Sequence, residues 1–264
     1  MLAHPALPDR PFTWVHALLQ GWRSWWHMLH VGSIVLLLAL SPGSYTPAFR
    51  RRTAQHIYAS TWRVMPWFTA LSALLSLVLI RIVVVTALSY GLSQYALQMV
   101  VRVLVLELIP LSAALFVALR AGLSFNAGAE SVTARQAVAQ RTLDLDCLRD
   151  HWTPRVLADA FAVLALATLS SVVILVLAYL TVYGLSPWGL PGFTRTVGQV
   201  FDLPVSLGFI LKTLFFSLAV AIVPMAAGLE AAHQRATDTI QPGAVRLFLV
   251  LFLLEAASLA VKYI

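Results

Sequence analysis

The segment Val156–Tyr183 reads VLADAFAVLALATLSSVVILVLAYLTVY and contains a single charged residue, Asp159. An α-helix needs about 20 apolar residues to cross a hydrocarbon core of about 30 Å, so this segment is long enough to span a membrane. The sequence therefore predicts an all-α polytopic membrane protein with five transmembrane helices. Four further stretches have the same character, the last of them near the lower length limit: Val64–Leu88, Val100–Leu119, Val205–Leu229 and Val245–Val261.

The composition of the chain agrees with this fold class. Of its 264 residues 60% are hydrophobic and only 11% are charged, whereas about a quarter of the residues of ordinary soluble domains are charged. The formal net charge of +7 could suggest a nucleic-acid partner. However, the basic residues are not gathered into an aromatic-rich patch, which such a binding face requires, so we expect no nucleic acid.

The basic residues are distributed according to the side of the membrane. Six arginines precede the first predicted span, and the connection Ser89–Met99 that follows that span has no charge. The connection of residues 121–155 again contains four arginines, whereas the next one has only Arg195 and Asp202 as charged residues. By the positive-inside rule, the sequence predicts a multi-pass membrane protein with a cytoplasmic N-terminus and its C-terminus on the opposite side.

The first 63 residues are expected to form a cytoplasmic N-terminus with an amphipathic interfacial helix. The apolar run His30–Leu40 is too short to span upright, and it follows a segment with four tryptophans and Arg23. Such a mixture favours the headgroup level of the membrane. No cleavable signal peptide is expected, because no short apolar core with a small-residue cleavage site follows Met1–Pro11. Residues 64–264 are expected to form one five-span domain.

The connection between the second and third predicted spans, at about residues 121–155, is rich in charge. Thr133–Gln136 has the form of a capping box and predicts a short polar helix over residues 134–142. Three aspartates and four arginines surround this helix. Such a surface suits contact with another protein, and a merely solvated helix is the alternative.

Several charged residues fall inside the predicted spans, where each costs several kcal/mol unless it is paired or hydrated. Glu107 and Lys212 each lie eight residues into their spans, so we expect them to face a polar cavity or another helix. On an α-helix Arg102 is offset by roughly 140° from Glu107, which makes their pairing awkward. Lys212 or a zwitterionic headgroup is therefore the expected partner of Glu107. They include Arg81, Arg102, Glu107, Asp159, Lys212 and Glu255.

Motifs that would give the chain its own chemistry are missing. There is no G-x-x-x-x-G-K-[ST] sequence, so any ATP-driven work needs a separate subunit. His27 and His30 have helical spacing but no neighbouring carboxylate or cysteine, so we expect no metal site. The single cysteine, Cys147, excludes an intrachain disulfide. We therefore expect no cofactor on this chain.

From the second span onwards the sequence resembles the MlaE/YrbE permease family, the membrane subunits of ABC transporters that move lipids together with MCE-domain proteins. Glu107-Leu-Ile-Pro110 and Ala118-Leu-Arg-Ala-Gly122 are similar to the family's E-L-G-P and A-G-R-A-G at the same separation. Leu106 stands where the family often has an arginine. The other matching residues are Gln136, Asp146, Pro154-Arg155, Lys212-Thr-Leu-Phe-Phe216, Gly228 and Arg235-Ala-Thr237.

The resemblance implies a transport subunit rather than an enzyme. It implies a homodimer of five-span protomers that bind a cytoplasmic ABC ATPase, which holds the ATP, and a periplasmic MCE-domain protein. The cargo is expected to be phospholipid or a related membrane lipid. Arg102, Glu107 and Lys212 would line the lipid cavity. Coupling to the ATPase would involve Glu130, Arg135, Gln136, Arg141, Asp146 and Arg155.

Two other classes of protein stay open. A non-transporting structural or assembly protein of the membrane would bind no ATPase through the charged connection. An integral-membrane enzyme would need a nucleophile, a base or metal ligands clustered at one membrane depth, and neither a G-x-S-x-G nor an H-E-x-x-H motif occurs.

Overall fold

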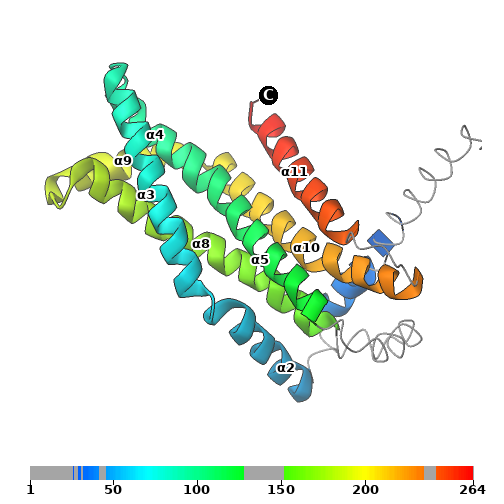
Figure 1. Cartoon of the computed structure of the whole chain (residues 1–264). Helices are drawn as coiled ribbons and strands as arrows, with labels where there is room; N and C mark the ends of the chain where they lie inside the picture. Colours follow the sequence, from blue (N-terminus) through cyan, green and yellow to red (C-terminus); the bar gives the residue numbers. More distant parts are fainter. Residues whose placement is uncertain are drawn as a thin grey trace, which may run out of the picture.

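The fold is a bundle of long helices. The computed structural model describes residues 32–41, 46–127, 152–234 and 242–263, together with Trp26, Leu29 and His30. Residues 32–40 are helical and precede the elements labelled in Figure 1. The elements that follow are α2 (Pro47–Ile57), η2 (Tyr58–Trp62), α3 (Met65–Ser89), α4 (Ser93–Val100), η3 (Val101–Leu108), α5 (Ile109–Ala127), α8 (Thr153–Tyr183), η6 (Pro187–Gly189), α9 (Leu190–Val200), α10 (Leu203–Gln234) and α11 (Pro242–Tyr263).

Five helical segments are long and apolar enough to cross a membrane, which confirms the predicted fold class. Prolines mark the first turn of most of these helices, where the missing backbone N–H costs nothing. Pro66, Pro154 and Pro242 are examples. The five segments are Phe49–Ser89, Tyr95–Ala121, Thr153–Tyr183, Leu203–Ala227 and Gly243–Val261.

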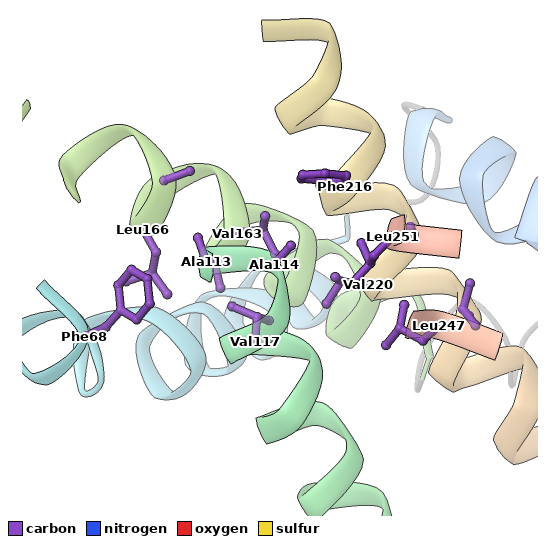
Figure 2. Packing of buried hydrophobic residues seen from close by; sticks show 14 of the residues in the cluster. Phe68, Ala113, Ala114, Val117, Val163, Leu166, Phe216, Val220, Leu247 and Leu251 are labelled. Atoms are coloured by element: carbon purple, nitrogen blue, oxygen red, sulfur yellow. The ribbon is translucent and has the colours of Figure 1, made fainter. Parts of the chain in front are cut away.

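The centre of the bundle is packed with small and medium side chains. Ala113 and Ala114 of α5 meet Val163 and Leu166 of α8, and alanine at such positions lets helices approach closely. Figure 2 shows these side chains converging, with Phe68 of α3 closing one side of the cluster. Phe216 and Val220 of α10 continue the same cluster towards Leu247 and Leu251 of α11, as Figure 2 also shows.

The two ends of the bundle carry different elements. In Figure 1, α9 lies at one end beside α4, and α2 leaves the bundle at the other end. The helix of residues 32–40 packs on α8 and α10 through Val35, which meets Val156, Ala221 and Met225. This helix coincides with the run His30–Leu40 that the sequence predicts as interfacial, and its contacts place it against the bundle.

Three local features differ from the sequence-based expectation. α2 and η2 continue the first span backwards, so the helical segment begins at Phe49 rather than Val64. The connection after the third span contains the helix α9, which was not expected from the sequence. η3 at the start of the second span is π-helical. The predicted helix of residues 134–142 lies outside the described residues.

Candidate functional site

Three ionisable side chains from three spans meet inside the bundle. Lys212 of α10 forms ion pairs with Glu107 of η3 and with Glu255 of α11. Its ammonium nitrogen lies 2.8 Å from a carboxylate oxygen of Glu255 and donates a hydrogen bond to Glu107 Oε2. Lys212 is one of the two partners that the sequence predicts for Glu107, the other being a zwitterionic headgroup, and the structure contains the pair with Lys212. We call Glu107, Lys212 and Glu255 the ion cluster.

The surroundings of the ion cluster keep water away from the lysine. The Lys212 side chain is 4% exposed, against 18% for Glu107 and 14% for Glu255. The ammonium also lies 5.6 Å from the ring centroid of Phe216, one helical turn further along α10, within the range of a cation–π contact. An ionised group persists at such a place only with partners, which here come from two other helices.

The charges of the ion cluster do not balance. One ammonium faces two carboxylates, so with all three ionised the cluster has a formal charge of −1. Within a span, such an excess has to be compensated by a proton, by water or by an incoming cationic group. The geometry therefore suits an exchange of partners, in which a positively charged group replaces the ammonium beside one carboxylate.

The backbone around Glu107 departs from α-helical geometry. Val101–Leu108 is a π-helix, a form often found at functional sites, and Pro110 follows it closely. In a regular α-helix the ring of Pro110 would clash with the carbonyl group of Leu106, four residues earlier. We attribute the wider π-helical turn to this proline.

The π-helix corrects one expectation about Arg102. Hydrogen bonds in a π-helix join residues five apart, so Arg102 and Glu107 are about one turn apart and not on different faces. Nevertheless the Arg102 side chain is exposed and forms no ion pair with either carboxylate in the part of the chain that the structure describes. Lys212 supplies the cation of the ion cluster.

Glu255 is the member that sequence reasoning missed. It was recognised as a charge within the fifth span but was not expected beside Glu107 and Lys212. Its spacing in the sequence gave no indication, because the contact depends on how α11 packs against α10. The only available indication was the free-energy cost of a carboxylate within a span, because such a group needs a partner in the last span as well.

Most of the predicted coupling residues cannot be placed. Glu130, Arg135, Gln136, Arg141 and Asp146 lie outside the described residues. Arg155 is in the first turn of α8 and lines a cleft formed with α2, η2 and α5. Within the described ranges, no group of three or more histidine, cysteine or acidic side chains could hold a metal ion.

A comparison with protein families matches residues 53–259 to the family described as Permease MlaE. The chain belongs to the MlaE permease family. The match extends from α2 into α11 and includes all three members of the ion cluster, so the resemblance seen in the sequence is confirmed. A search of curated proteins found no match to the chain.

Proposed function

We propose that this MlaE-family chain is the permease subunit of an ABC transporter. It moves a phospholipid or related lipid between the inner membrane and a periplasmic MCE-domain protein. Family membership supports the transport role, and five apolar helices support the membrane location. The observation that carries the proposal furthest is the ion cluster, because a costly charged group shared by three spans suits a polar cargo path.

The chemistry of the ion cluster complements a zwitterionic headgroup. A phosphate can replace a carboxylate beside the Lys212 ammonium, and a headgroup ammonium can compensate the carboxylate that is released. The headgroup would then pass the cluster without leaving an unpaired charge in the span. In this proposal the exposed Arg102, one π-helical turn away from Glu107, attracts the phosphate before the headgroup reaches the ion cluster.

The energy comes from a partner, because the chain has no phosphate-binding loop of its own. In our proposal two protomers form a homodimer around a lipid-sized cavity, and each contacts a cytoplasmic ATPase through the connection of about residues 121–155. The helix predicted over residues 134–142 receives the force. The protomers rock when ATP binds and is hydrolysed, which changes the cavity between them.

Reconstitution tests this function. The full chain is placed in liposomes with its ATPase and MCE-domain partners, and ATP-dependent transfer of a fluorescent phospholipid to acceptor vesicles is measured. Arg135→Glu together with Arg141→Glu should weaken co-purification of the ATPase or uncouple ATP hydrolysis from transfer. The matched control is Arg195→Gln in α9, an exposed arginine at the far end of the bundle.

The outcomes separate transport from the alternative role. ATP-dependent transfer that needs Arg135 and Arg141 supports the permease. A chain that binds no ATPase and transfers no lipid in the presence of both partners would instead be a structural or assembly protein of the membrane.

A further inference from the structure

A second polar site lies far from the ion cluster, where α2 and η2 meet the end of α5 and the start of α8. It is a cleft with a volume of about 270 Å³. Arg120 in its lining is thirteen residues beyond Glu107 on one continuous helix, which corresponds to about 20 Å. The polar lining comes from His56, Ser60, Arg120, Arg155 and Asp159, and Val117 is among the apolar lining residues.

One wall of the cleft is held in place by Arg120. Its guanidinium group donates hydrogen bonds to the carbonyl oxygens of Ala59 and Ser60 in η2, at 2.6 and 2.9 Å. The Ser60 hydroxyl donates to the carbonyl oxygen of Ala158 at 3.4 Å. These contacts join three elements that are distant in the sequence. Hydrogen bonds between η2, α5 and α8 therefore hold the walls of the cleft together.

The depth of the cleft is that of lipid headgroups. Arg120 is the next-to-last residue of the second candidate span, and Arg155 is the third residue of the third one. Both therefore lie near the boundary of the hydrocarbon region. α2, which carries His56, also has the exposed basic residues Arg50, Arg51 and Arg52. Basic side chains at this depth attract lipid phosphates.

The cleft contains charges of both signs. Arg155 and Asp159 are four residues apart on α8 and so lie on one face of it. Asp159 is also within electrostatic reach of Arg120. A lone phosphate would meet the Asp159 carboxylate, and a lone ammonium would meet two guanidinium groups. A ligand with a phosphate and an amine close together matches both kinds of charge.

We propose that this cleft binds the headgroup of a zwitterionic aminophospholipid, with the phosphate beside Arg155 and His56 and the ammonium beside Asp159. Arginine is suited to phosphate because its planar fork of donors can bind two oxygens at once. Arg120 mainly holds the η2 wall. This site is separate from the proposed cargo path, and the proposal does not depend on transport.

Native mass spectrometry of the purified, delipidated full chain tests the proposal. Dioleoyl phosphatidylethanolamine and dioleoyl phosphatidylglycerol are added separately, and the retained lipid is counted. The wild-type protein should retain the ethanolamine lipid about tenfold better, as expected for one charge-assisted hydrogen bond. Asp159→Asn should lower this preference to what the ion cluster alone provides, and Arg155→Gln should weaken retention of both lipids in the cleft about tenfold by the same reasoning.

Controls keep the test decisive. Arg195→Gln should leave the retention of both lipids unchanged. Arg155→Lys keeps the positive charge, so it should retain more lipid than Arg155→Gln does. It takes the place of Arg155→Gln in the test if that variant folds poorly. Competition by phosphoethanolamine but not by inorganic phosphate would show that the headgroup is recognised as a unit. Competition by inorganic phosphate alone would mean an anion site and would overturn the aminophospholipid assignment. Equal retention of the two lipids by the wild-type protein, or an ethanolamine preference that Asp159→Asn leaves unchanged, would also overturn it.

The same variant separates this role from coupling. Arg155→Gln that keeps the ATPase bound but loses lipid supports the headgroup site. Loss of the ATPase with unchanged lipid retention would assign Arg155 to coupling alone.

Discussion

Lys212 and Glu255 join the fourth and fifth spans through an ion pair of 2.8 Å. Otherwise the fifth span has little protein around it, since only 11% of its most apolar stretch is buried, against 56% for the second span. Apart from Leu247 and Leu251, its apolar side chains are exposed or only partly buried. The ion pair therefore adds a polar contact to the packing of α11 on α10, in which Leu247 and Leu251 are the buried side chains of α11.

Replacing Lys212 by methionine should destabilise the protein strongly. Methionine has a similar length but no charge, so Glu107 and Glu255 would face each other in the bundle without a cation. Removing one partner of a buried ion pair typically costs about 3–5 kcal/mol. Thermal unfolding in detergent, followed by size-exclusion chromatography, measures the loss.

The control for this variant is a triple substitution. Lys212→Met with Glu107→Gln and Glu255→Gln has no uncompensated charge and should recover most of the stability, because replacing a buried ion pair as a whole is often tolerated. A single Lys212→Met variant as stable as the wild type would mean that both carboxylates are already neutralised by other groups.

Arg120→Gln should loosen the junction between α2 and α3. The arginine donates two hydrogen bonds to the carbonyl oxygens of Ala59 and Ser60, and glutamine is too short to reach both. Hydrogen bonds of charged donors contribute about 1.5–3 kcal/mol each. Hydrogen exchange of residues 58–64 should accelerate, while exchange in α11 serves as the internal reference. Unchanged exchange at η2 would show that apolar packing alone holds this junction.

The five spans were predictable because they depend on local properties. Length and hydropathy of Val156–Tyr183 are enough to identify a membrane helix without knowledge of its neighbours. The pairing of Glu107 with Lys212 was also predictable, since deeply placed opposite charges need each other. In both cases the physical requirement can be read from one segment or from a simple balance of charges.

Features that depend on helix packing could not be predicted. Glu255 reaches Lys212 only because α11 lies against α10, and the cleft beside Arg120 needs four elements at once. The π-helix η3 had a visible cause in Pro110, but a proline can kink, break or widen a helix, and the sequence does not select among these. The helix α9 was missed because the glycines and prolines of Gly184–Gly192 indicate turns.

The orientation in the membrane is a further prediction. The excess of arginines before the first span and within residues 121–155 places these regions in the cytoplasm. Reporter fusions at Ser93 and Ser186 should therefore read periplasmic, and a fusion at Gln140 should read cytoplasmic. A periplasmic signal at Gln140 would invert the whole topology and place the Arg120 cleft in the outer leaflet.

Glu107→Gln and Glu255→Gln form a matched pair, because each removes one carboxylate from Lys212 and preserves the side-chain shape. Either change leaves one ammonium facing one carboxylate, so folding should be largely retained. Glu107 lies in the π-helix near Arg102, where the proposed path runs, whereas Glu255 mainly anchors α11. We therefore expect Glu107→Gln to lower ATP-dependent lipid transfer about tenfold, as for loss of one charge-assisted contact in the path. Glu255→Gln should reduce thermal stability more than transfer.

The two variants are compared in the same liposomes, with ATP hydrolysis recorded beside lipid transfer. Full transfer by Glu107→Leu would mean that this carboxylate has no part in the cargo path, and the path would then have to be sought away from the ion cluster.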